Sequence, residues 1–165
     1  MGTIVVGVDG SAGGYAALRW ALDEARLRGT KLRVVHVYHS PQLPLTEAGV
    51  GAAGGLGVPV LAETADELGR AAEAEATSLI EEGLRRAGSD STRGLEIERA
   101  ALQGPTAQTL IDSASGAELL VVGSHGRGGF LGLLLGSTSQ QCAQHPPCPV
   151  VILPPPGEAD PGAAG

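Results

Sequence analysis

The stretch ELLVVGSHGRGGFLGLLLGSTSQQCAQ, residues 118–144, decides the fold. Residues 118–122 are apolar enough to predict a strand that is buried on both faces, as strands of parallel sheets are. A loop rich in glycine follows, and residues 137–144 are predicted to form a helix. This order is typical of anion sites in α/β proteins, because the N–H groups at a helix N-terminus attract phosphate.

The rest of the chain repeats the alternation of strand and helix. Apolar runs predict strands at 3–9, 31–38, 95–102, 118–122 and 150–153. Helical spacing predicts helices at 12–28, 62–87, 105–115 and 137–144, with a long loop at 39–59. The order predicts an α/β, Rossmann-like domain: a five-stranded parallel sheet of order 3-2-1-4-5 with helices on both faces. Residues 1–153 form this domain, and we expect the tail 154–165 to be disordered.

Composition and charge argue against several classes of function. The formal net charge is -7 and Lys31 is the only lysine, which disfavours a nucleic-acid partner. The apolar runs are too short to cross a bilayer and the N-terminus lacks a signal-peptide pattern, so we expect a cytoplasmic protein with no membrane partner. Cys142, His145 and Cys148 have the wrong spacing for zinc, so we expect no metal site and two reduced thiols.

The predicted strand order places two polar turns at one crevice. Residues 9–11 leave the first strand and residues 123–137 leave the fourth, and ligands bind where such loops diverge. We expect Gly123 and Gly126 to let backbone N–H groups reach an anion, and Gly136 to allow a tight helix entry. Ser137 and Thr138 would add hydroxyl donors and an N-cap.

Other nucleotide-binding and hydrolase motifs are missing or misplaced. The chain has no G-x-x-x-x-G-K-[ST] string and no G-x-S-x-G string. A G-x-G-x-x-G string occurs at Gly49, Gly51 and Gly54, but it lies within the long loop. We interpret it as a chance match.

Two segments carry a resemblance to a known family. IVVGVDGSAGGYAALRWAL at 4–22 and VVGSHGRGGFLGLLLGSTSQQCAQHPPCPVVIL at 121–153 resemble the universal stress protein family, in particular its ATP-binding branch with the loop G-x2-G-x9-G-[ST]. The resemblance covers about residues 3–153. It implies a five-stranded parallel sheet, ATP at the switch point, and a homodimer paired through Val150–Leu153.

The resemblance also implies which residues contact the nucleotide. It places adenosine near Gly7, Val8, Asp9 and Val37. It places phosphate and ribose on the later loop, just after Val122, where the matching residues are Gly123, Ser124, His125, Gly126, Gly136, Ser137 and Thr138. Gly104 matches the family's glycine at the end of the third strand, and Arg127 matches a position that is often basic.

Some residues keep a second interpretation. Asp9 could be only the cap of the turn that follows it. His36 is interpreted as a satisfied core or edge residue, and His39 as an ordinary surface residue. His125 lacks an obvious orienting carboxylate, so we expect no catalytic role for it.

Three functions stay open. The first is a nucleotide-binding regulator of a stress response, with ATP or AMP as ligand and an unknown downstream partner. The second is a slow ATP hydrolase or nucleotidyl-transferring enzyme, for which His125 and Arg127 are the candidates. Phosphoryl transfer needs several cations, however, and the loop offers only Arg127. The loop also contains no acid, so any Mg²⁺ would be carried mainly by the phosphates, with Asp9 as the one plausible protein acid nearby. The third is a dimeric scaffold without a ligand.

Overall fold

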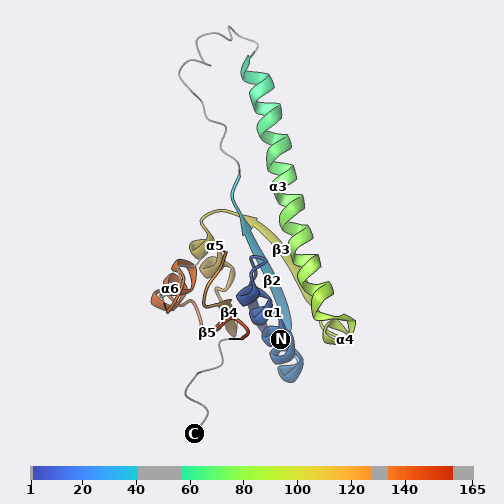
Figure 1. The fold of residues 1–165 in the computed structure, drawn as a ribbon, viewed down its shortest axis with the longest axis vertical. Coiled ribbons are helices and arrows are strands. Elements are labelled where there is room, and N and C mark those ends of the chain that lie inside the picture. The colour runs from blue at the N-terminus through green and yellow to red at the C-terminus, as the bar shows by residue number, and fades with distance from the viewer. Residues whose placement is uncertain (1, 41–56, 128–133, 158–165) are drawn as a thin grey trace.

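The computed structural model describes residues 2–40, 57–127 and 134–157 (Figure 1). Its strands form one five-stranded sheet of order β3-β2-β1-β4-β5. The strands are β1 (Thr3–Gly7), β2 (Lys31–Tyr38), β3 (Ile97–Gln103), β4 (Leu119–Gly123) and β5 (Val150–Leu153). All neighbouring strands are parallel, and β1 pairs with β4 from Ile4–Leu119 to Val6–Val121. The predicted sheet and strand order are confirmed.

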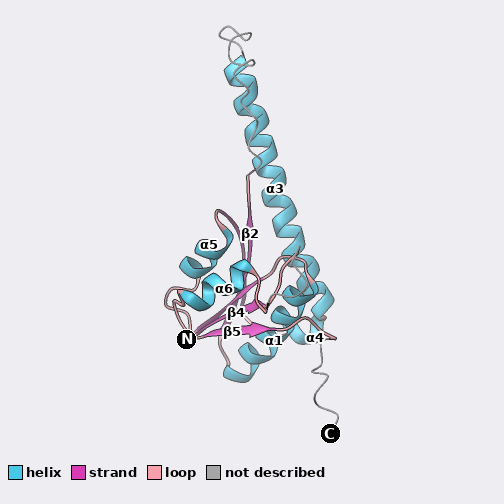
Figure 2. Cartoon of the chain, turned by 60° about the vertical axis from the view of Figure 1, so that its left-hand side comes forward, coloured by secondary structure: helices cyan, strands magenta, loops and turns pink. Residues whose placement is uncertain are grey.

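Helices cover both faces of this sheet, as predicted (Figure 2). They are α1 (Ala12–Arg28), α3 (Gly57–Ala87), α4 (Ser89–Thr92), α5 (Thr106–Ser113) and α6 (Ser137–Gln144). α1 and α3 lie on one face, and α5 and α6 on the other. α3 runs along the sheet and continues well past the end of β2 (Figure 1). Among the described helices, none is both long and apolar enough to span a membrane.

The core consists of two aliphatic layers, one on each face of the sheet. Ile4 and Val6 of β1 pack under α1 and α3, whereas Val5 between them packs with α5 and α6. Successive side chains of a strand point to opposite faces, so a strand buried on both sides has to be apolar at every position. This explains why the strands appear in the sequence as continuous apolar runs.

The ends of α1 follow the sequence signals. The Ser11 side chain accepts a hydrogen bond from Gly14 N, which caps the N-terminus. Gly29 adopts a left-handed conformation with φ 64 and ends the helix, as glycine does most readily. The turn at residues 9–11 is therefore fixed by the start of α1.

Several predicted boundaries were wrong. α3 begins at Gly57 and not at residue 62, because Pro59 lies in its first turn, where proline costs no helical hydrogen bond. β1 ends at Gly7, β3 is shifted to Ile97–Gln103, α5 ends at Ser113, and the short helix α4 was not predicted. The glycine string at residues 49–54 and most of the predicted tail lie outside the described residues.

Candidate functional site

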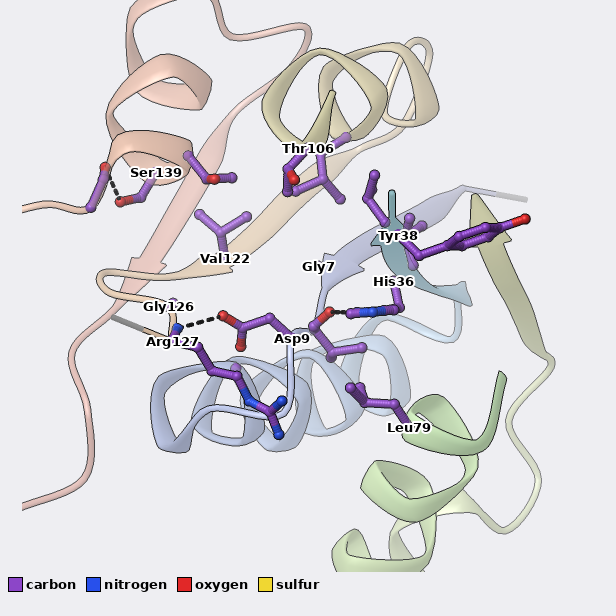
Figure 3. Close-up of a pocket in the computed structure, with 18 of the residues that line it drawn as sticks. Gly7, Asp9, His36, Tyr38, Leu79, Thr106, Val122, Gly126, Arg127 and Ser139 are labelled. Atoms are coloured by element: carbon purple, nitrogen blue, oxygen red, sulfur yellow. Dashed lines mark hydrogen bonds between the residues drawn. The ribbon is translucent and has the colours of Figure 1, made fainter. Parts of the chain in front are cut away.

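A pocket of about 750 Å³ lies at the carboxyl ends of the strands, where the loops after β1 and β4 diverge. Figure 3 shows it bordered by the ends of β1, β2 and β4, by α3, and by the starts of α5 and α6. Of the residues predicted to contact a nucleotide, all but Gly104 and Ser124 line it. Strand order thus brings most of the predicted site together.

Two of the predicted residues, Ser124 and Gly104, do not line the pocket. The Ser124 carbonyl accepts hydrogen bonds from Gly136 N and from the Ser139 hydroxyl. Gly104 follows β3 with φ +152, and a Cβ there would lie 2.6 Å from Thr109 Oγ1. Ser124 therefore holds the start of α6, and the position of Gly104 leaves no room for a side chain beside α5.

Asp9 ties the two loops together. Its Oδ1 accepts hydrogen bonds from Ser11 N at 3.0 Å and from Ser11 Oγ at 2.5 Å. Its Oδ2 accepts one from Arg127 N at 3.2 Å, across 118 residues of sequence (Figure 3). The interpretation of Asp9 as a turn cap is confirmed, and the same carboxylate also fixes the position of the loop after β4.

The glycines of these loops have a different purpose from the one predicted. A Cβ on Gly123 would lie 2.7 Å from the carbonyl carbon of Gly13, and a Cβ on Gly126 would lie 2.5 Å from Asp9 Oδ2. We expected the missing side chains of Gly123 and Gly126 to leave room for an anion. Instead, the neighbouring loop occupies that space, so the glycines allow the two loops to touch.

Backbone and hydroxyl hydrogen bonds hold the start of α6 against the loop. Gly136 N donates to Ser124 O at 2.6 Å, and Ser139 Oγ donates to Ser124 O at 2.8 Å and to Gly136 O at 3.0 Å. The predicted N-cap at Ser137 was wrong: the cap residue is Gly136, with an extended φ of -69. The Ser139 hydroxyl helps to hold α6 against the loop because it is buried beside these two carbonyls. No local sequence pattern indicates this role.

The first turn of α6 offers hydrogen-bond donors to the pocket. The first helical hydrogen bond runs from Gln140 N to Gly136 O, so the helix does not use the N–H groups of Ser137 and Thr138. Both residues line the pocket, and their hydroxyls are further donors. These groups can bind an anion at the positive end of the helix dipole.

β2 and α3 form the opposite wall, much of which the sequence did not reveal. His36 Nδ1 lies 2.7 Å from Val8 O, which confirms that His36 is hydrogen-bonded, yet its side chain also lines the pocket. His39, expected on an ordinary surface, lines it too, with Nε2 3.4 Å from Thr106 Oγ1. α3 contributes Ala72, Glu75, Ala76 and Leu79. Their helical spacing was the one signal that could have indicated a shared face.

The pocket has few charged groups. In the described chain, the charged side chains that line it are Asp9, Glu75 and Arg127, and residues 128–133 contain none. The Arg127 guanidinium extends toward Gly10, where a Cβ would lie 2.9 Å from Nη2. An anion in this pocket therefore depends on N–H and hydroxyl donors more than on cations.

The two cysteines lie away from the pocket. Cys142 is buried in the layer under α6, and Cys148 packs against the same layer. Burial raises the pKa of both thiols, and a hydrogen bond to the Leu120 backbone partly offsets this for Cys148. Within the described residues, no group of three or more His, Cys, Asp or Glu side chains could hold a metal ion.

Comparison with known structures agrees with this fold. The chain is similar to the universal stress protein UspA from Lactobacillus plantarum, with a TM-score of 0.69 and 24% identity over 92% of this chain and 97% of that one. It is also similar to a universal stress protein in complex with cAMP, with a TM-score of 0.58 and 25% identity over 92% of this chain and 95% of that one. An Arabidopsis thaliana family protein with AMP bound has a TM-score of 0.55 at 14% identity, covering 99% of this chain and 97% of that one, and shows the fold alone.

Sequence comparison identifies the family. A universal stress protein of Mycolicibacterium smegmatis is 36% identical over 153 residues, which are 92% of this chain and 45% of that protein. A universal stress protein of Mycobacterium tuberculosis is 34% identical over 153 residues, which are 91% of this chain and 46% of that protein. The chain thus spans about half the length of the curated relatives it matches. The family model for universal stress proteins matches residues 1–154, and the chain belongs to the universal stress protein family.

Proposed function

We propose that this chain binds ATP in the pocket between β1 and β4 and acts as a nucleotide-dependent regulator in a cytoplasmic stress response. The observation that carries the proposal is the geometry of the pocket: unused N–H groups and hydroxyls of α6 face a space at the switch point of the sheet. The complex of a similar family member with cAMP supports a nucleotide as the ligand.

The phosphates would lie at the end of the pocket that α6 and its loop form. There, Gly126, Ser137 and Thr138 offer donors, and Arg127 is the nearest fixed cation. The adenosine would extend past Val8 and Asp9 toward Val37, along the ends of β1 and β2. Mg²⁺ would arrive on the phosphates, because the Asp9 carboxylate already accepts three hydrogen bonds from protein groups.

The same geometry favours binding over turnover. Phosphoryl transfer needs cations that neutralise the charge developing on the phosphoryl group. Arg127 is the only basic side chain with a fixed charge among the described lining residues, and its guanidinium extends toward Gly10. We therefore infer regulation by occupancy, with ATP or AMP as alternative ligands.

Mass spectrometry of the nucleotide released from denatured, purified protein tests the proposal directly. We expect ATP or AMP in the supernatant and saturable ATP binding by titration calorimetry. Gly136→Val should abolish the binding, because a Cβ there already lies 3.3 Å from Ser124 O and a larger side chain would displace the loop. Gly69→Val is the matched control, since only Ser40 Oγ lies near that Cβ, at 3.7 Å. Absence of released nucleotide together with no binding at millimolar ATP would end the proposal.

A slow hydrolase or nucleotidyl-transferring enzyme is the second candidate. The observation in its favour is that His125 and Arg127 line the phosphate end of the pocket. A turnover assay decides between the two functions: release of ADP or AMP above the rate of a Gly126→Val variant would favour the enzyme. We expect no such excess.

We also propose that the protein forms a homodimer through β5. This strand lies at the edge of the sheet, and Val150–Leu153 are apolar and only half-buried. An unpaired apolar edge strand readily pairs with another chain. Light scattering at micromolar concentration should give the mass of a dimer, and a monomer would exclude this arrangement.

A further inference from the structure

The two ends of the pocket differ in chemistry. This inference rests on the proposed function, in which the phosphates occupy the end formed by α6 and its loop. The nucleobase then lies at the other end, which β2 and α3 form from Val37, Ala76 and Leu79. Figure 3 shows His36 on this side, near Leu79 and across the pocket from Gly126.

The hydrogen bond of His36 fixes the position of its proton. Nδ1 lies 2.7 Å from Val8 O, and a carbonyl oxygen can only accept a hydrogen bond. Nδ1 must therefore carry a proton and donate it. In the neutral ring, Nε2 then has a lone pair and can only accept.

Nε2 is also available to a ligand. Among the described residues, no protein group forms a hydrogen bond with Nε2, and the half-buried ring borders the pocket. The base end of the pocket thus presents an acceptor at His36.

We propose that His36 is a specificity-determining residue whose Nε2 accepts a hydrogen bond from the exocyclic amino group of the bound base. Adenine presents an N–H donor at its 6-position, whereas a 6-oxopurine presents an acceptor there. A 6-oxopurine would place its oxygen against the lone pair of His36 Nε2, which cannot donate to it. The pocket therefore selects adenine nucleotides over inosine and guanine nucleotides through a side chain of β2.

The test compares the affinities of ATP and inosine triphosphate by calorimetry. In the wild-type protein we expect ATP to bind more tightly by about five- to tenfold, the effect of one net hydrogen bond. His36→Phe removes the acceptor but keeps a ring, so it should weaken ATP binding, leave inosine triphosphate binding nearly unchanged and bring the ratio close to one. His145→Phe, an exposed histidine outside the pocket, is the matched control and should keep the wild-type ratio.

The outcomes separate this inference from the proposed function. If the wild-type protein binds neither nucleotide, the proposed function fails and the inference fails with it. If both bind equally well, or if His36→Phe keeps the wild-type ratio, only the inference is overturned. An equal loss for both nucleotides would also overturn it, because His36 would then not distinguish the two bases.

A measurement on the wild-type protein covers the case in which His36→Phe does not fold. Long-range ¹H–¹⁵N spectra of the imidazole distinguish a protonated from an unprotonated ring nitrogen. We expect a protonated Nδ1, an unprotonated Nε2, and a shift of the Nε2 resonance on addition of ATP that inosine triphosphate does not reproduce. A protonated Nε2 in the ATP complex, or equal shifts with both nucleotides, would overturn the inference.

Discussion

Gly126→Ala should separate the two loops of the pocket. The new Cβ would lie 2.5 Å from Asp9 Oδ2, a separation that real Cβ atoms essentially never show, and Gly126 has no left-handed φ that would add backbone strain. Either Asp9 or the loop has to move. The bond from Arg127 N to Asp9 Oδ2 is the contact most directly in the way.

The magnitude follows from that bond. A hydrogen bond to a charged acceptor contributes about 1.5–3 kcal/mol, and the half-buried Asp9 favours the lower end of this range. We expect the free energy of unfolding to fall by about 1.5 kcal/mol. If ATP binds only when the loop has its wild-type position, binding has to supply the same free energy. About 1.4 kcal/mol corresponds to a factor of ten in affinity, so ATP binding should weaken about tenfold.

Urea denaturation and calorimetry measure the two effects, and a double-mutant cycle assigns the cause. In an Asp9→Ala background the Cβ meets no carboxylate, so Gly126→Ala should cost much less stability than in the wild type. Gly69→Ala in α3 is the control and should stabilise the protein by about 0.5–1 kcal/mol, as alanine does in a helix. Additive effects of Asp9→Ala and Gly126→Ala, or a Gly126→Ala protein with wild-type stability, would refute the reasoning.

Three further predictions concern the packing and the thiols. Ser139→Ala should lower the free energy of unfolding by about 1 kcal/mol, measured by urea denaturation, since its hydroxyl donates to two carbonyls; no loss would contradict this role. Ile80→Ala should lower the free energy of unfolding by about 2–5 kcal/mol because Ile80 is fully buried. Leu27 is 81% exposed, so Leu27→Ala should lower it hardly at all. Similar losses for the two variants in thermal unfolding would contradict the position of Ile80 in the core. Burial raises the pKa of Cys142 and Cys148 above 9.0, so the unfolded chain loses these protons first as the pH rises. The free energy of unfolding should therefore be insensitive to these thiols at neutral pH and fall above about pH 9, and the decline should shrink when both are replaced by alanine.

The sequence predicts the layers of this fold well because each strand is buried on both faces. Continuous apolar runs such as Leu119–Val122 favour strands buried on both faces, and alternation with helices favours a parallel sheet covered on both sides. Boundaries were less certain where a residue suits two structures. Pro59 favours a loop in most contexts but is equally compatible with the first turn of α3.

The candidate site was predictable in position but not in its contacts. The spacing of Gly123, Gly126 and Gly136 after a buried strand located the pocket. The hydrogen bond from Arg127 N to Asp9 joins residues 118 positions apart, and no local pattern encodes it. The role of Gly126 was misjudged for the same reason, since the atom that fills its Cβ position comes from the other loop.

The central claim is that a nucleotide places its phosphates at the start of α6, beside the loop that follows β4. Backbone ¹H–¹⁵N spectra recorded during an ATP titration test it most directly. We expect saturable shifts that are largest at the amides of Gly126, Ser137 and Thr138. No shifts at millimolar ATP, or shifts concentrated at α4 and the far end of β3, would contradict it.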